Sequence, residues 1–209
     1  MQSFTFLKIS ASKMNSCFMD QNYIEGKVFD KGDYSQSLLH KGEYENCSFK
    51  NCNFSNADLS QIIFTDCRFD GCNISLAILN QTAFRGVAFV NCKMLGLHFE
   101  NCNSFGMTVG FDTCNLSHSS FYKTKLRKTT FRNSKLQEVD FVECELISSL
   151  FDNCDLIGAV FEGTILEKAD FRTSFNYSIN PVTNKIKKAR FSMAGVAGLL
   201  DTFDIDLSF

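Results

Sequence analysis

Residues 111–171 read FDTCNLSHSSFYKTKLRKTTFRNSKLQEVDFVECELISSLFDNCDLIGAVFEGTILEKADF. Every fifth residue in this stretch is large and apolar, and phenylalanine alternates with leucine throughout. These positions are Phe111, Leu116, Phe121, Leu126, Phe131, Leu136, Phe141, Leu146, Phe151, Leu156, Phe161, Leu166 and Phe171. A period of five fits neither an α-helix, with its period of 3.6, nor a strand, with its period of two. A short period sustained over this length indicates a solenoid, in which each unit packs on its neighbours.

The same period runs through the preceding part of the chain. Its large residues there are Tyr44, Phe49, Phe54, Leu59, Phe64, Phe69, Ile74, Leu79, Phe84, Phe89, Met94 and Phe99. The position two residues before each large one is mostly Cys, Ala, Ser or Thr, and Ile62, Val87, Leu97, Val109 and Val139 are bulkier exceptions. Each unit therefore directs one large and one small side chain inward, and the other three positions are mostly polar.

Several units resemble the pentapeptide-repeat motif, among them CNFSN at 52–56, ADLSQ at 57–61 and ADFRT at 169–173. The resemblance implies an all-β fold, a right-handed quadrilateral β-helix with four units in each coil. Residues twenty apart would then stack at the strand spacing of ~4.8 Å, and the units would form about six coils.

This register predicts columns of side chains. Two phenylalanine columns should face each other, Phe111, Phe131, Phe151 and Phe171 in one and Phe121, Phe141 and Phe161 in the other. The leucines should form the remaining two columns. On the outside, the order Asp112, Arg132, Asp152, Arg172 predicts a ladder of ion pairs.

The chain divides into three parts. We expect residues 1–43 to form an N-terminal extension with a cap or a degenerate first coil, 44–173 the β-helix, and 174–209 a loop, a short helix and a strand. The spacing from Phe99 to Phe111 is twelve residues instead of ten, which places a two-residue insertion in the break at 103–110. The break is either a bulge between two half-rods or a projecting contact element that includes Phe105 and Met107.

The C-terminal part is apolar and needs a surface on which to bury. Ser192 is a candidate cap for a short helix. The candidate cap and dimer residues are Met193, Val196, Leu199, Leu200, Phe203, Ile205 and Leu207. Ile205, Leu207 and Phe209 alternate like a terminal strand. We expect this segment to cover the last coil, to form a homodimer with a second chain, or both.

The middle of the chain carries a run of basic residues, with no acidic residue between Asp112 and Glu138. We call this set the basic belt: Lys123, Lys125, Arg127, Lys128, Arg132 and Lys135. It is either a solvated surface compensated by acidic neighbours above and below, such as Asp112, Glu143 and Asp152, or a contact for an acidic protein surface or a phosphate backbone. A second basic cluster consists of Lys185, Lys187, Lys188 and Arg190.

No constellation of catalytic residues is visible. His40, His98 and His118 are scattered, the predicted interior is filled by Phe and Leu, and no glycine-rich phosphate loop precedes a helix. We expect no enzymatic activity, no cofactor and no metal. Nine of the ten cysteines occupy or continue the small inward position, which indicates reduced structural thiols and a cytoplasmic protein. No apolar stretch is long enough to predict a membrane span, and the net charge of −2 gives no bulk attraction to nucleic acid.

The order of parts resembles the quinolone-resistance (Qnr-type) pentapeptide-repeat proteins. That resemblance implies a ligand of the type II topoisomerases DNA gyrase and topoisomerase IV, which imitates DNA and protects these enzymes from quinolones. The alternative hypothesis is a general protein-interaction scaffold with an unidentified partner that contacts the basic belt. A third hypothesis, direct nucleic-acid binding through the belt, is not the expected one.

Overall fold

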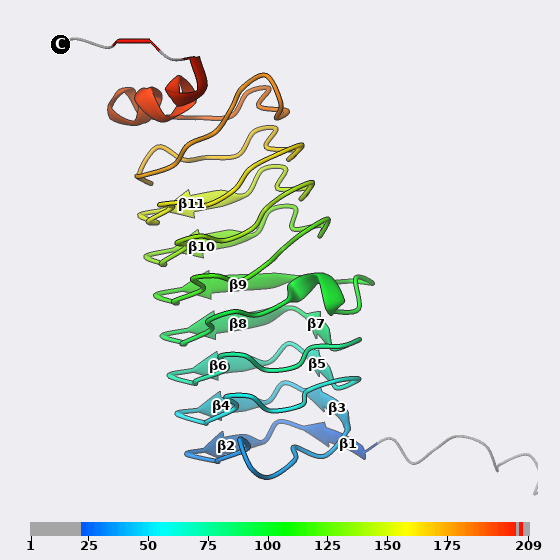
Figure 1. Cartoon of the computed structure of the whole chain (residues 1–209). Helices are drawn as coiled ribbons and strands as arrows, with labels where there is room; N and C mark the ends of the chain where they lie inside the picture. The colour runs from blue at the N-terminus through cyan, green and yellow to red at the C-terminus, as the bar shows by residue number, and fades with distance from the viewer. Residues whose placement is uncertain (1–21, 204, 207–209) are drawn as a thin grey trace, which may run out of the picture.

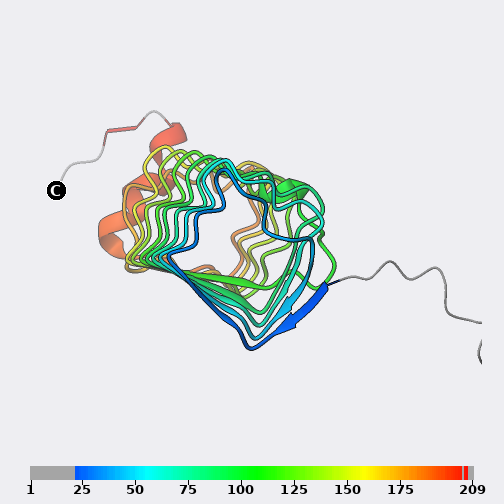
Figure 2. The same ribbon diagram turned by 90° about the horizontal axis from the view of Figure 1, so that it is seen from below.

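The computed structural model describes residues 22–203, 205 and 206. The chain winds into a rod of stacked coils (Figure 1), and a view along the rod shows that each coil has a four-sided outline (Figure 2). The fold class predicted from the five-residue period, a quadrilateral β-helix with a short C-terminal helix, is confirmed.

Two adjacent sides of the rod carry parallel sheets. The first sheet contains β1 (Asn22–Glu25), β3 (Gly42–Glu45), β5 (Ile63–Thr65) and β7 (Ala83–Arg85). The second contains β2 (Val28–Asp30), β4 (Ser48–Lys50), β6 (Arg68–Asp70), β8 (Val87–Val90), β9 (Val109–Asp112), β10 (Thr130–Arg132) and β11 (Leu150–Asp152). Paired residues such as Phe49 and Phe69 are twenty apart, as the four-unit coil predicts.

A column of phenylalanines lies behind the second sheet. Its members are Phe29, Phe49, Phe69, Phe89, Phe111, Phe131, Phe151, Phe171 and Phe191. Successive rings are stacked, with centroids from 4.4 Å to 5.5 Å apart. The predicted column from Phe111 to Phe171 is therefore confirmed, and it is longer than predicted at both ends. Each stacked ring buries a large apolar area and favours in-register coils.

The opposite phenylalanine column is also confirmed. Phe121 stacks on Phe141 at 5.4 Å, and Phe141 stacks on Phe161 at 5.1 Å. The two columns meet edge to face, as Phe131 and Phe141 do at 5.9 Å and 83°. The centre of the rod is therefore filled with side chains.

The small inward positions form hydrogen bonds to the coil below. The thiol of Cys72 donates to the carbonyl of Phe49 at 3.4 Å, and the hydroxyls of Ser149 and Thr164 donate to the carbonyls of Leu126 and Phe141. Cys, Ser and Thr all occur at this position because each is small and each can donate one such hydrogen bond. In the part of the chain that the structure describes, all cysteines are free and buried, as structural thiols should be.

The chain turns its corners through residues in the left-handed region of backbone space. Asn is frequent there, as at Asn51 and Asn153, because its short side chain tolerates positive φ. Five lysines occupy such corners, with φ between 55° and 60°: Lys31, Lys123, Lys128, Lys168 and Lys188. Their side chains therefore leave the rod at its edges.

Residues 22–43 continue the coil at the N-terminal end. Asn22 pairs with Gly42 across β1 and β3, and the rings of Phe29 and Tyr34 stack on Phe49 and Phe54, each pair at 4.7 Å. The coil also continues past 173, through parallel bridges from Ile165 to Lys185 and from Asp170 to Arg190.

The C-terminal segment forms the 3-10 helices η2 (Met193–Leu199) and η3 (Asp201–Phe203), in addition to η1 (Phe99–Asn101) within the rod. Ser192 caps η2 as predicted, since its hydroxyl accepts a hydrogen bond from the amide of Gly195 at 3.2 Å. A Cβ atom at Gly198 would lie 1.9 Å from the carbonyl oxygen of Tyr177, so glycine permits the close approach of η2 to the last coil. No helix among the described residues has the length and apolarity of a membrane span.

Candidate functional site

The regular register changes once along the rod. Ala88 pairs with Arg68 on one side, twenty residues back, and with Gly110 on the other, twenty-two residues ahead. The first sheet ends at β7, whereas the second sheet continues from β8 to β9. The two extra residues lie within the segment 103–110 that the spacing marks as a break, on the face of the first sheet. We call residues 103–108 the slip.

The slip directs one apolar side chain outward and another inward. The amide of Phe105 donates to Oδ1 of Asn103 at 3.0 Å, and Gly106 turns the chain with φ of 71°. Phe105 is 79% exposed, and the guanidinium of Arg85 lies 5.9 Å from the centroid of its ring. Met107 is partly buried against the core. The two residues that the sequence groups in one contact element therefore differ in placement: Phe105 projects and Met107 packs.

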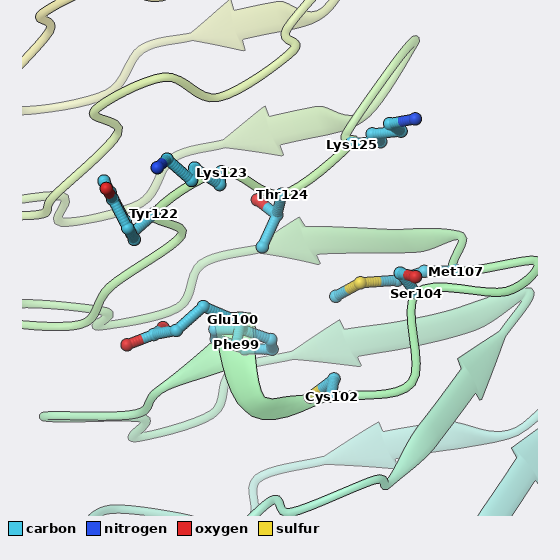
Figure 3. Close-up of a pocket in the computed structure, with 9 residues that line it drawn as sticks. All are labelled: Phe99, Glu100, Cys102, Ser104, Met107, Tyr122, Lys123, Thr124 and Lys125. Atoms are coloured by element: carbon cyan, nitrogen blue, oxygen red, sulfur yellow. The ribbon is translucent and has the colours of Figure 1, made fainter.

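A hollow of about 420 Å³ opens on the surface beside the slip (Figure 3). Its lining residues are Phe99, Glu100, Cys102, Ser104, Met107, Tyr122, Lys123, Thr124 and Lys125. Figure 3 shows Ser104 and Met107 on one side and Tyr122 and Lys123 on the other. The hollow forms because Ser104 stands where the period requires a large residue. The sequence excludes a pocket inside the rod, and this surface hollow was not predicted.

Charged groups around the hollow are mostly paired. Oε1 of Glu100 lies 2.9 Å from Nδ1 of His98, while its buried Oε2 has no hydrogen-bond partner among the described residues. Nζ of Lys123 lies 4.7 Å from the centroid of the Tyr122 ring and 3.5 Å from a carboxylate oxygen of Glu143. Both neighbours raise the pKa of Lys123, Tyr122 more than Glu143, so this lysine remains charged.

All six residues of the basic belt are exposed, and most pair with an acidic residue on the next coil. The pairs are Lys123 with Glu143 at 3.5 Å, Lys125 with Glu145 at 3.9 Å, Arg127 with Glu145 at 2.8 Å and Arg132 with Asp152 at 3.2 Å. Lys128 and Lys135 have no acidic partner within 4 Å in the described part of the chain. Compensation by Glu143 and Asp152 is confirmed, while Asp112 instead accepts hydrogen bonds from its neighbours Thr113 and Asn133.

The predicted outer ladder of ion pairs is only partly correct. Arg132 pairs with Asp152, but Arg172 turns to Asp170 at 2.8 Å. Asp152 already accepts hydrogen bonds from Arg132 and Thr173, and Asp170 lies two residues from Arg172 on the same coil. The nearer carboxylate therefore replaces the one predicted from the column.

Comparison with known proteins identifies the repeat. A family model described as the pentapeptide repeat region matches residues 43–105 and 104–176. The chain belongs to the pentapeptide-repeat family. No curated protein matches the chain.

Two solved structures are similar to this chain. A trypsin-treated variant of QnrB1, a plasmid-mediated fluoroquinolone resistance protein, is 18% identical, with 90% of this chain and 92% of that chain covered and a TM-score of 0.59. HetL from the cyanobacterium Nostoc sp. strain PCC 7120, involved in heterocyst differentiation regulation, is 14% identical, with 80% and 84% covered and a TM-score of 0.36. At these identities the likeness to QnrB1 establishes the fold.

In this pentapeptide-repeat rod, the C-terminal candidates are unequally buried. Val196, Leu199 and Leu200 are half-buried, whereas Met193 is 87% exposed and Phe203 is also exposed. Ile205 is exposed and forms no strand with Asp206, and Leu207 lies outside the described residues. No group of three or more His, Cys, Asp or Glu side chains between 22 and 206, residue 204 aside, is placed to hold a metal ion.

Proposed function

We propose that this protein is a non-catalytic, protein-binding scaffold whose partner contacts the slip. The observation that carries the proposal is Phe105, the most exposed phenylalanine of the described residues. Aromatic side chains, phenylalanine among them, are enriched in protein interfaces relative to the rest of the surface. The hydrogen bond to Asn103 and the contact with Arg85 hold Phe105 in place before binding, which lowers the entropy cost of association.

The interior supports a role in binding. Phenylalanine and leucine fill the rod, and the inward hydroxyls and thiols are buried and bonded to backbone carbonyls. Function is therefore expected on the outside, where the slip, the hollow and the basic residues interrupt an otherwise regular surface.

A paired substitution tests the scaffold proposal. Phe105→Ala should remove the partner that the wild-type protein retains from a lysate of its own cells. Phe175→Ala is the matched control, because Phe175 is also exposed and lies away from the slip. Equal retention by the wild type and Phe105→Ala, with circular dichroism unchanged, would reject the slip as the contact.

A finer version of the proposal names the partner as a type II topoisomerase, which the protein would protect from quinolones by imitating DNA. It is supported by the likeness of fold to QnrB1 over 90% of this chain and by the resemblance to Qnr-type proteins. The purified protein should relieve the inhibition of gyrase supercoiling by ciprofloxacin. Absence of relief at micromolar protein, together with absence of gyrase binding, would eliminate this version and leave the general scaffold.

Two further proposals concern the oligomeric state of the protein and its location in the cell. The exposed Met193 and the half-buried Val196 and Leu200 support a homodimer through the C-terminal segment. The free, buried thiols support a location in the reducing cytoplasm, which cell fractionation would test.

A further inference from the structure

Part of each basic cluster of the sequence lies on one face of the rod. Parallel bridges connect Lys125 to Glu145, Glu145 to Ile165, and Ile165 to Lys185, so these four residues form one column. Three coil spacings separate its two lysines, or ~14 Å. Basic residues that are sixty residues apart in the chain therefore belong to the same surface, which begins directly beyond the slip.

We call the surface of units 124–128, 144–148, 164–168 and 184–188 the basic face. Its basic residues are Lys125, Arg127, Lys128, Lys168, Lys185, Lys187 and Lys188. Its acidic residues are Glu145 and Glu167. Seven positive and two negative side chains give this face a net charge of +5, in a chain whose net charge is −2. The views in Figures 1 and 2 place η2 on the other side of the rod from β1, so η2 does not cover this face.

The charge on the basic face is divided into two rows. The first and last units carry three cations each, whereas the two units between them carry one, Lys168, together with Glu145, Glu167 and the half-buried Ile147 and Ile165. Glu145 pairs with both Lys125 and Arg127 in the first row.

The remaining lysines are available to a partner. Those without an acidic residue within 4 Å in the described chain are Lys128, Lys168, Lys185, Lys187 and Lys188. All five are exposed, and the last row is uncompensated.

The separation of the cations into two rows favours a protein segment over a nucleic acid as the partner. A DNA strand carries one phosphate per ~3.4 Å, so a strand that joined the two rows would place phosphates against Glu145 and Glu167. An extended peptide advances ~3.3 Å per residue, so two acidic clusters with centres about four residues apart match the ~14 Å between the rows. Apolar residues between those clusters would contact Ile147 and Ile165.

We propose that the basic face binds a protein segment in which two acidic clusters flank a short apolar stretch. The inference rests on the proposed scaffold function and names the chemistry of its partner. The acidic clusters contact the two rows of cations, and the apolar stretch covers the isoleucines. Exposed ion pairs individually contribute little, so several must act together across both rows.

Two fluorescent peptides of identical composition test the pattern at low salt. Glu-Glu-Leu-Val-Glu-Glu has divided charge, and Leu-Val-Glu-Glu-Glu-Glu has contiguous charge. The divided peptide should bind about threefold more tightly, because only it reaches both rows while covering the isoleucines. Equal affinity for the two peptides would overturn the proposal, since net charge alone would then explain binding. Tighter binding of a mixed-sequence duplex DNA would overturn it in favour of a nucleic acid.

Matched charge reversals locate the contact. Lys185→Glu with Lys188→Glu should weaken the divided peptide about tenfold. Lys27→Glu with Lys31→Glu is the control, because both of these lysines are exposed on another face and Lys31, like Lys188, has positive φ. Equal weakening by both variants would reject the basic face. Because Phe105→Ala tests the slip separately, failure here would leave the scaffold proposal standing.

Discussion

Replacing Phe131 by alanine should destabilise the rod by about 3–5 kcal/mol, the usual cost of deleting a buried phenylalanine ring. Phe131 is fully buried between Phe111, at 5.1 Å, and Phe151, at 4.9 Å. Its ring also meets Phe121 and Phe141 edge to face, at 6.1 Å and 5.9 Å. The alanine variant loses all four contacts and leaves a cavity that the stacked coils cannot readily close.

Phe131→Leu separates the aromatic contribution from the hydrophobic one. Leucine keeps most of the buried apolar area but loses four aromatic contacts, which at about 0.5 kcal/mol each predicts a cost of about 2 kcal/mol. Phe105→Ala is the control and should change stability by less than about 0.5 kcal/mol, because Phe105 is exposed.

Urea unfolding followed by circular dichroism measures these differences, and unchanged slopes would show that the unfolded state is the same in each variant. A cost below about 1 kcal/mol for Phe131→Ala would refute the view that the column stabilises the rod. A cost near zero for Phe131→Leu would refute a separate aromatic contribution.

Three further predictions concern the thiols and the C-terminal cap. Burial raises the pKa of Cys144 to about 12 and that of Cys154 to about 11, from an ordinary value near 9, so the folded state favours the neutral thiols. Their contribution to stability is complete below pH 9 and is lost as the pH rises through these values; a urea midpoint that stays constant up to pH 12 would contradict this. Gly198→Ala should displace η2 from Tyr177 and increase proteolysis near 193–203, whereas Ala197→Ser, at an exposed position, should not. Light scattering should find a dimer for the full chain and a monomer for a chain truncated after Lys188; a monomeric full chain would eliminate the C-terminal dimer.

The sequence predicts the interior well because each column depends only on the period. Once four units form one coil, Phe111 must stack on Phe131, whatever lies outside. The same counting locates the slip, since only the spacing from Phe99 to Phe111 departs from a multiple of five within 44–171. The five-residue period therefore determines the interior packing and the coil register.

The period does not determine which of several nearby groups an outer side chain contacts. Arg172 has a carboxylate on its own coil and another on the coil below, and only the structure shows that it selects Asp170. The hollow depends on Met107 packing inward while Ser104 fills little space. The basic face could not be predicted for another reason: the sequence indicates a loop after residue 173, whereas the coil register continues through Lys185 to Arg190.

The phenylalanine column gives the rod different stiffness in different directions. The stack passes the slip without a gap, with Phe89 and Phe111 still parallel at 5.5 Å, while the first sheet ends at β7. Bending the rod so that these rings move apart must break stacked contacts. Bending it so that the rings stay in contact mainly opens or closes the side that carries the slip. A partner that contacts the rod on both sides of the slip would therefore change the shape of the hollow, while the phenylalanine column keeps its stacking.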